Sequence, residues 1–290
     1  MIIDMHAHTS SRELFDLHVK YARIQDLEDF AAKYGISKIA LMATYFPFKG
    51  KGLKNADLLE RIRGHDLFLV FGSLDIPNRF QEGICELEKL AQKHLISGIK
   101  LYPGYQEFYC SDPAVFPVYE LAQKYGLPVM LHGGELHHCC PEEKRKLGQT
   151  LCGRYECPLD HLAHLSHPEQ VAEAALHFQK VLFIVSHLSN PYFDDLRKVM
   201  ERCENVCTDI SGQWKSRSEE DTPEYKQEIG REIMKFLELK NGLQRMLFAS
   251  DFPIQSYEDS IELIKKLSIS LDEKEMIFSK NALRILNAKK

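Results

Sequence analysis

Residues 1–10 read MIIDMHAHTS, an apolar run that ends in a His-x-His pair, His6 and His8, preceded by Asp4. Side chains alternate between the two faces of a β-strand, so residues 4, 6 and 8 are expected to point the same way. Two imidazoles two residues apart can bind one metal ion. The opening stretch therefore predicts a strand that ends in part of a metal site.

Seven further runs rich in apolar and β-branched residues follow along the chain. Runs that are apolar at consecutive positions suit strands buried on both faces, as in a parallel sheet. The eight expected strands comprise residues 2–6, 36–45, 67–75, 96–104, 127–135, 181–189, 205–212 and 245–253.

Helical patterns separate these runs. Asp112 fits the start of a helix that Gly126 closes, and Pro168 opens another. Ser256 with Asp259 resembles a capping box ahead of a third helix. Strand and helix alternate throughout the 290 residues. We therefore predict an α/β fold, a (β/α)8 TIM barrel, in one domain that spans residues 1–290.

Two segments interrupt the regular spacing of strands and helices. Residues 135–166, between the fifth and sixth expected strands, are extra, polar and rich in histidine and cysteine, which predicts an inserted loop over the barrel mouth. Residues 211–221, SGQWKSRSEED, are a second candidate lid. Arg154, Trp214 and Arg217 lie in these segments and are interpreted as solvated loop residues rather than site residues.

Three later strands also end in a candidate ligand. His132 follows PVML, His187 follows LFIVS and Asp251 follows MLFAS. The C-terminal ends of barrel strands lie at one face, where active sites of this fold are found. The joint pattern indicates a metal centre at the mouth, with a small molecule as the partner.

These residues resemble the amidohydrolase superfamily, in its amidohydrolase-related (type 2) branch of metal-dependent hydrolases and decarboxylases. The resemblance runs over the whole chain. It rests on IIDMHAH at 2–8, HPEQVAEAALHF at 167–178, VLFIVSHLS at 181–189 and FSKNALRILN at 278–287.

The resemblance implies that His6, His8, His132 and Asp251 ligate one divalent metal ion, with zinc as the first choice. It implies that His187 is a catalytic histidine beside the metal rather than an obligatory ligand. Zinc with an open position lowers the pKa of bound water to about 7. Asp251 would then accept the water's proton while His187 polarises the water or the substrate oxygen.

Lys100, in GIKLYPG, leaves the number of metal ions open. In two-metal members of the superfamily a carboxylated lysine on strand 4 bridges the ions, with His132 and His187 then on the second metal. Alternatively, Lys100 is an ammonium that binds an anionic substrate group, or an ordinary surface or salt-bridged lysine. One ion is favoured because the branch that the chain resembles usually has one. Asp4 is expected either to orient a ligand or to be tied to neighbouring backbone.

The insertion concentrates histidine and cysteine, which raises the hypothesis of a structural zinc site. The spacings lack paired C-x₂₋₄-C geometry, so solvated or pocket-lining side chains are the preferred interpretation. His137 and His138 follow the fifth strand closely enough to touch substrate. The residues concerned are His137, His138, Cys139, Cys140, Cys152, Cys157, His161, His164 and His167.

The leading functional prediction is a metal-dependent hydrolase of an amide, ester or lactone-type bond in a small polar molecule. The first alternative is a metal-dependent non-oxidative decarboxylase of an aromatic or unsaturated acid, with the same ligands. A non-catalytic barrel that binds a metal or ligand is the third hypothesis, and it predicts no activity on any substrate.

Bulk properties exclude other classes. The net charge is −5 and the 37 Lys and Arg residues are scattered, which does not suggest nucleic-acid binding. No signal-peptide pattern or membrane-length apolar run is present, so no membrane partner and a cytoplasmic location are expected. Eight irregularly spaced cysteines are typical of reduced thiols. The sequence leaves a homo-oligomer open.

Overall fold

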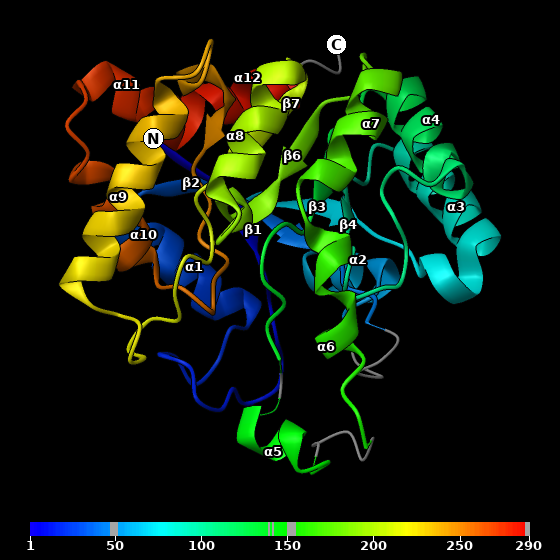
Figure 1. Cartoon of the computed structure of the whole chain (residues 1–290), viewed down its shortest axis with the longest axis horizontal. Coiled ribbons are helices and arrows are strands. Elements are labelled where there is room, and N and C mark those ends of the chain that lie inside the picture. Colours follow the sequence, from blue (N-terminus) through cyan, green and yellow to red (C-terminus); the bar gives the residue numbers. More distant parts are fainter. Residues whose placement is uncertain (47–51, 139, 141, 150–154, 288–290) are drawn as a thin grey trace.

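The computed structural model describes residues 1–46, 52–138, 140, 142–149 and 155–287. Its eight strands form one sheet in the order β1 to β8, and each consecutive pair is parallel. The strands are β1 Ile2–Ala7, β2 Ile36–Met42, β3 Phe68–Gly72, β4 Gly98–Leu101, β5 Val129–Leu131, β6 Phe183–Val185, β7 Val206–Asp209 and β8 Met246–Leu247. The predicted TIM barrel is confirmed (Figure 1).

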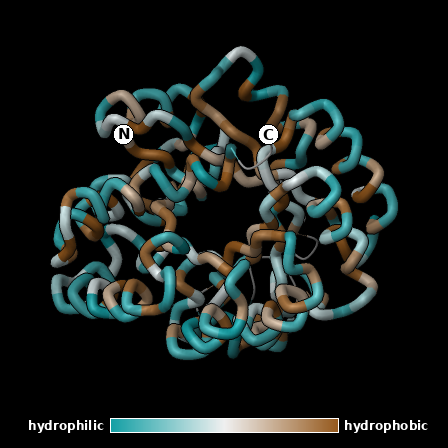
Figure 2. The backbone as a smooth tube through the Cα atoms, turned by 90° about the horizontal axis from the view of Figure 1, so that it is seen from above, coloured by the Kyte–Doolittle hydropathy of each residue, from teal (hydrophilic) through white to brown (hydrophobic). Residues whose placement is uncertain are grey.

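Backbone hydrogen bonds join the last strand to the first. The Met5 N–H donates to the Phe248 carbonyl at 3.1 Å, and the His8 N–H donates to the Phe252 carbonyl at 2.7 Å. Figure 2 shows the chain as a ring, with hydrophobic segments toward the centre and hydrophilic turns outside. The two ends of the sheet therefore meet at a β8–β1 seam.

Helices alternate with the strands, as predicted. They are α1 Ile24–Tyr34, α2 Asn55–Arg61, α3 Ile76–Gln92, α4 Phe116–Tyr125, α5 Glu142–Lys146, α6 Leu159–Leu162, α7 Glu169–His177, α8 Phe193–Arg202, α9 Pro223–Leu237, α10 Tyr257–Lys265, α11 Leu271–Glu275 and α12 Asn281–Asn287.

The predicted helix ends are largely confirmed. Asp112 caps a short 3₁₀ turn that leads into α4, and Gly126 ends α4 in the left-handed conformation at φ 61°. Ser256 accepts the Asp259 N–H at 3.1 Å and so caps α10. The Asp259 carboxylate does not reach back to the Ser256 N–H, because it is taken by other side chains described below.

Inward positions on the strands change from apolar to polar toward the mouth. Within the barrel an apolar cluster includes Met130, Ile184 and Cys207. Two residues further along the same strands, on the same face, stand His132, Ser186 and Asp209. Because side chains on one face of a strand recur every two residues, the packed barrel interior lies directly beneath the polar site. This is the usual arrangement of the fold.

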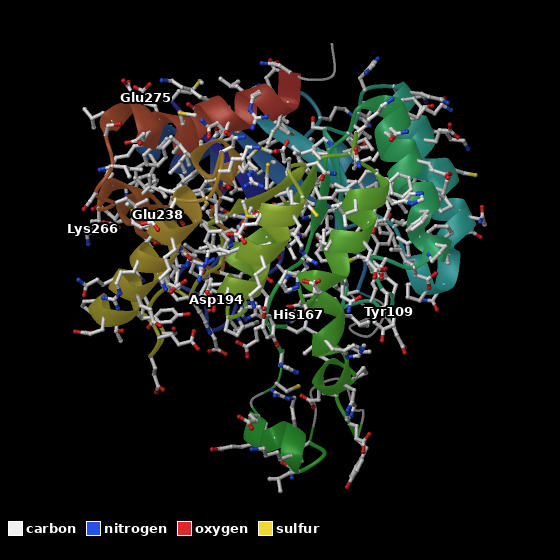
Figure 3. All side chains as sticks on the ribbon, turned by 45° about the horizontal axis from the view of Figure 1, so that its top comes forward. Tyr109, His167, Asp194, Glu238, Lys266 and Glu275 are labelled. Carbon is white, nitrogen blue, oxygen red and sulfur yellow. The ribbon has the colours of Figure 1, made fainter. Side chains whose placement is uncertain are left out.

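The insertion between β5 and α7 contains α5 and α6. At its base Leu136 and Leu159 pack in an apolar cluster with Tyr102 and Tyr105 from the loop after β4. Helix α5 buries none of its side chains and stands clear of the barrel (Figures 1 and 3). The insertion is therefore anchored at the mouth by its base alone among the described residues.

Across the described ranges, no helix combines the length and apolar character that crossing a membrane requires. The six cysteines that the structure describes are free thiols, as expected, whereas Cys139 and Cys152 lie outside the described residues.

Candidate metal centre

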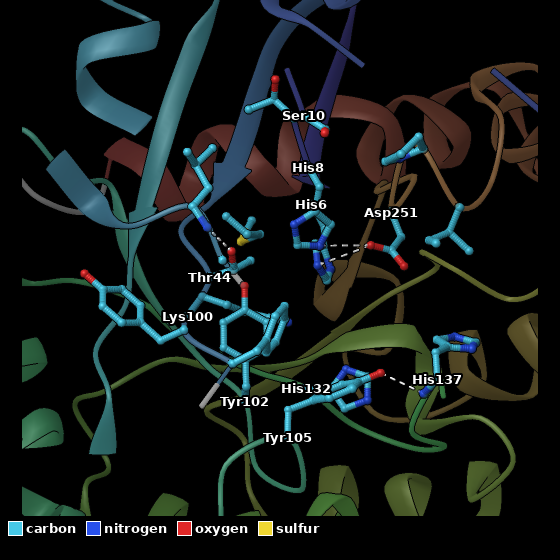
Figure 4. Close-up of a pocket in the computed structure, with 18 of the residues that line it drawn as sticks. His6, His8, Ser10, Thr44, Lys100, Tyr102, Tyr105, His132, His137 and Asp251 are labelled. Atoms are coloured by element: carbon cyan, nitrogen blue, oxygen red, sulfur yellow. Dashed lines mark hydrogen bonds and ion pairs between the residues drawn. The ribbon is translucent and has the colours of Figure 1, made fainter. Parts of the chain in front are cut away.

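Three of the predicted ligands meet at the β8–β1 seam. Asp251 Oδ1 lies 3.2 Å from His8 Nε2 and 3.7 Å from His6 Nε2 (Figure 4). One ligand atom from each residue falls within 4.8 Å of the other two. Atoms bonded to one zinc ion at about 2.0–2.2 Å lie roughly 3–4 Å apart, so this group fits a divalent ion.

The backbone holds the Asp251 carboxylate in place. Asp251 has a left-handed φ of 54°, which is costly for a residue other than glycine. Its N–H donates to the His6 carbonyl at 2.8 Å across the seam. The backbone strain at Asp251 is tolerated because this hydrogen bond to β1 holds the turn after β8 in place.

The protonation states suit metal binding. Burial lowers the pKa of His6 to about 3, with the charge of Lys100 acting in the same direction. Burial alone would raise the pKa of Asp251, but the hydrogen bond from His8 and the nearby histidines outweigh it and hold that pKa well below its usual range. A neutral imidazole and an ionised carboxylate are the forms that ligate metals.

Asp209, the last residue of β7, and Ser211, two residues later, also contact the site, and the sequence analysis missed both. Ser211 Oγ donates to Asp209 Oδ1, and the same hydroxyl lies 2.9 Å from His187 Nδ1 and 3.3 Å from His6 Nδ1. Because its own proton goes to Asp209, this oxygen accepts from the imidazoles. Asp209 is fully buried and follows an apolar run as the other site residues do, which was the available signal.

This contact pattern assigns the imidazole tautomers. His187 Nδ1 lies 3.1 Å from the Ser211 carbonyl oxygen, which can only accept, so Nδ1 carries the proton. His6 Nδ1 also faces acceptors, including Asp209 Oδ2 at 3.7 Å. In both rings Nε2 is therefore the atom left with a lone pair for a metal or a proton.

His187 lies beside the group of three. Its ring centroid is 5.0 Å from that of His6 and 5.0 Å from that of His132. His187, Leu188 and Ser189 all have left-handed φ angles, of 65°, 51° and 54°. Three consecutive residues in this conformation make a strained backbone, which contacts with the surrounding barrel hold in place. Such strain is common at functional sites.

His132 reaches the site from β5 but does not join His6, His8 and Asp251 within 4.8 Å. Its Nε2 lies 3.1 Å from the Glu135 carbonyl oxygen, so Nε2 donates and Nδ1 keeps the lone pair. Its pKa lies well below the usual value because of burial.

Lys100 is fully buried, which excludes an ordinary surface lysine. Its Nζ donates to Ser186 Oγ at 2.8 Å. Burial lowers its pKa to about 8, although Asp209 and Asp251 oppose the shift. Lys100 is thus a weakly basic amine beside the site.

Asp4 lies behind the site on β1. Its carboxylate accepts the Ser250 N–H at 3.0 Å, the Ser250 hydroxyl at 2.6 Å and the His6 N–H at 3.1 Å. Both predicted roles are therefore met at once: Asp4 is tied to backbone, and this tie positions His6 next to the segment that carries Asp251.

A cavity of about 870 Å³ opens onto these residues. Its walls come from the C-terminal ends of β1, β2, β4, β5, β6 and β8 and the segments that follow them, with Asp75 after β3. The lining includes His6, His8, Arg12, Tyr45, Phe46, Lys54, Arg61, Lys100, Tyr102, Tyr105, His132, His137, His187 and Asp251. Basic and aromatic side chains therefore surround the group of possible ligands.

Most of the loop residues singled out earlier lie elsewhere. Trp214 is buried, so its interpretation as a solvated loop residue is wrong, whereas Arg217 is exposed as expected. Neither lines the described part of the cavity. Arg154 lies outside the described residues. Of the two histidines expected to touch substrate, His137 lines the cavity, whereas His138 faces Asp160.

Solved structures with the same fold include both hydrolases and decarboxylases. A probable 2-pyrone-4,6-dicarboxylic acid hydrolase from Acinetobacter baumannii, with citric acid bound, is 15% identical with a TM-score of 0.67 over 98% of each chain. The 5-carboxyvanillate decarboxylase from Sphingomonas paucimobilis is 13% identical with a TM-score of 0.66 over 98% of each chain. A dihydroxybenzoic acid decarboxylase from Polaromonas sp. JS666, with manganese and 2-nitroresorcinol bound, is 15% identical with a TM-score of 0.65 over 100% of this chain and 97% of its own.

At such identities these structures establish the barrel fold alone. Among curated protein sequences no significant match is found. The amidohydrolase family model, however, matches residues 3–288, nearly the entire chain. The chain therefore belongs to the amidohydrolase family.

Proposed function

We propose that this protein is a metal-dependent hydrolase of an amide, ester or lactone-type bond in a small polar molecule that carries a carboxylate. The observation that carries the proposal is the group formed by His6, His8 and Asp251 at an open cavity, with His187 beside it. The fold places such groups where substrates bind.

The donor set is two imidazole nitrogens and a carboxylate oxygen, which suits zinc and also manganese. We assign one ion, with zinc as the first choice and His132 as a further ligand through Nδ1. When bound, a divalent ion supplies Lewis acidity that lowers the pKa of a coordinated water and polarises a carbonyl.

The chain's own residues then manage the protons. Asp251 is ionised at neutral pH, so its carboxylate accepts the proton of the attacking water and later returns it to the leaving group. His187, neutral because burial lowers its pKa, presents Nε2 to the water or to the substrate oxygen. Asp209 and Ser211 keep both imidazoles in the required tautomer.

The cavity supports an anionic, ring-containing substrate. Arg12, Lys54 and Arg61 bring positive charge to its walls, and Tyr102 and Tyr105 supply aromatic faces. Guanidinium groups bind carboxylates in a bidentate manner, and flat rings pack well on aromatic side chains. The names of the similar hydrolase and decarboxylases specify carboxylated rings, which agrees with this lining.

A decarboxylase is the second candidate. Two of the similar structures are decarboxylases of carboxylated phenols by name, and a basic, aromatic cavity suits such acids equally well. In that reaction Asp251 or His187 would first take up a proton from the phenol hydroxyl of the substrate or from solvent, and would then deliver it to the ring carbon that loses carbon dioxide.

The experiment is an assay of the metal-loaded protein on carboxylated lactones, esters, amides and phenols, with carbon dioxide measured alongside hydrolysis. His6→Ala and Asp251→Asn are expected to lower turnover by at least about 10³-fold, as for loss of a main catalytic group. His161→Ala, at a side chain that is 72% exposed, is the matched control and should keep wild-type activity.

Each result decides between the hypotheses. Hydrolysis without carbon dioxide supports the proposal, and carbon dioxide release from the phenols supports the decarboxylase. If the metal-loaded protein turns over no compound of either class, the non-catalytic barrel is the better account.

A further inference from the structure

Another group of side chains that could hold a metal ion lies in the insertion, away from the cavity. His138, Cys157 and Asp160 each offer one ligand atom within 4.8 Å of the other two. None of the three lines the described part of the cavity. The sequence did not single out Asp160, because an isolated carboxylate in a polar segment is not a metal-site signal by itself.

The contact between His138 and Asp160 is short but poorly aligned for a hydrogen bond. His138 Nε2 lies 2.9 Å from Asp160 Oδ1, yet this buried nitrogen has no well-aligned hydrogen-bond partner among the described residues. Two ligand atoms this close, with the N–H direction turned away from the oxygen, are arranged as they are around a shared ion.

Cys157 supplies the third donor and is only 6% exposed. An imidazole nitrogen, a thiolate sulfur and a carboxylate oxygen form a mixed set that suits zinc. A thiolate and a carboxylate together balance the charge of a dication. Arg145 supports the same carboxylate through its Nε, which lies 3.0 Å from Asp160 Oδ1, and thereby orients it.

The position of the group gives it a mechanical role. His138 lies on the outgoing side of the insertion, and Cys157 and Asp160 lie on the returning side. Helix α5 between them buries no side chain, so this helix adds no apolar packing that would close the loop. A bound metal closes such a loop and stabilises it by removing chain entropy.

We propose that His138, Cys157 and Asp160 form a second, structural site for a zinc-like divalent ion that fastens the two sides of the insertion together. The neighbouring His137 N–H donates to the Tyr105 hydroxyl at 2.7 Å, and both residues line the cavity. The ion therefore also stiffens one wall of the cavity. This inference uses none of the residues of the proposed active site and does not rest on the proposed function.

Cobalt substitution tests the site by its sulfur ligand. Chelator-stripped protein is titrated with Co²⁺, and the near-ultraviolet spectrum is recorded for a thiolate-to-cobalt charge-transfer band. The described lining of the active-site cavity contains no cysteine, so cobalt bound there gives no such band. Wild type should show the band. Cys157→Ser should lose it, whereas Cys85→Ser, at an exposed cysteine of α3, should keep it.

Zinc stoichiometry gives a second readout. Cys157→Ser is expected to bind one equivalent of zinc less than wild type under the same free zinc concentration. Asp160→Asn is the second variant, because its side chain is more exposed and tolerates substitution even if Cys157→Ser does not fold. Asp160→Asn should retain the cobalt band but bind zinc at this site at least tenfold more weakly. Absence of the band in cobalt-saturated wild type would overturn the proposal, and so would its persistence in Cys157→Ser or unchanged metal binding in Asp160→Asn.

Discussion

Gly212 occupies a position that only glycine fits. A Cβ there would lie 2.8 Å from Asp251 Oδ2 and 3.0 Å from His187 Nδ1, and the residue has a φ of +57°. We expect Gly212→Ala to lower kcat about 10²-fold, because a small displacement of catalytic groups has effects of this size. Steady-state kinetics together with bound-metal analysis measure it.

Gly35 provides the matched control. It ends α1 with a φ of +69°, and a Cβ there would meet nothing within 4 Å. Gly35→Ala should cost about 1–2 kcal/mol of stability from left-handed strain and leave kcat unchanged. Equal kinetic effects from the two alanines would show that the close approach at Gly212 is unimportant.

Ser211 acts on catalysis through the two imidazoles that it contacts. Ser211→Ala removes the hydroxyl that lies 2.9 Å from His187 Nδ1 and 3.3 Å from His6 Nδ1. Loss of such an orienting partner typically costs about 10–100-fold in activity or metal affinity. Ser73→Ala, at a buried hydroxyl without a partner among the described residues, should leave both unchanged. An inactive Ser73→Ala, or a fully active Ser211→Ala, would contradict this role.

Lys100 predicts a specific dependence of stability on pH. Its pKa in the folded protein is about 8, below the usual 10.5, so folding favours the neutral amine. Between these values the unfolded lysine is protonated and the folded one is not, so stability rises with pH across this window by roughly 3 kcal/mol.

The prediction is measured as a difference between two proteins. Denaturant unfolding of wild type and Lys100→Met is followed from pH 7.5 to 11. Subtracting the two free energies of unfolding removes the contribution of the groups that titrate in both proteins. Wild type should gain stability relative to the variant as the pH rises. A difference that stays flat would mean that Lys100 is not a free amine, as in a carboxylated lysine.

At the residue scale, strand-end position predicted three of the side chains that the structure brings together. His6, His8 and Asp251 were predicted because a ligand that ends an apolar run is visible in one sequence. Asp209 and Ser211 were missed because their role depends on contacts with His6 and His187, which are distant in the chain. The assignment of His132 as a ligand stays a prediction.

At the scale of elements, the segment 211–221 is anchored rather than lid-like. Asp259 on α10 binds Ser216 Oγ from this segment, Ser256 Oγ at 2.9 Å and Lys226 Nζ of α9 at 2.7 Å. The candidate lid predicted from its polar composition is therefore wrong for the described cavity, because composition does not reveal which polar side chains find partners.

Asp259→Asn tests this anchor. The change weakens an ion pair and hydrogen bonds at a partly buried carboxylate, which should cost about 1–3 kcal/mol of unfolding free energy. Glu258→Gln, at the exposed neighbouring position, should change it by less than about 0.5 kcal/mol. Thermal and denaturant unfolding decide, and an equally small effect from Asp259→Asn would refute the anchor.

Strand bounds were the less predictable part of the fold. The run at 181–189 predicts a long strand, but β6 ends at Val185. The chain turns at His187, Leu188 and Ser189. Their left-handed φ angles could not be predicted from the sequence, because none of the three is a glycine. Tertiary contacts, here the His187 N–H donating to Asp209 Oδ1 at 3.0 Å, determine such turns.

At the scale of the whole molecule, the order of eight βα units was predictable from alternation, and the meeting of the first and last strands followed from barrel closure. The proposed metal therefore joins β1 to the segment after β8. An ion that binds only the folded protein stabilises it by about 2.7 kcal/mol at a concentration of 100 times Kd. Chelation should lower Tm, and His8→Ala should abolish the part of this decrease that is due to the ion at the seam, leaving the part that is due to an ion in the insertion.

The most direct measurement is a crystal structure of the metal-loaded protein with anomalous data collected at the absorption edge of the metal. The account predicts an anomalous peak within bonding distance, about 2.0–2.3 Å, of His6, His8 and Asp251. Metal-loaded crystals without a peak among these three side chains would contradict it.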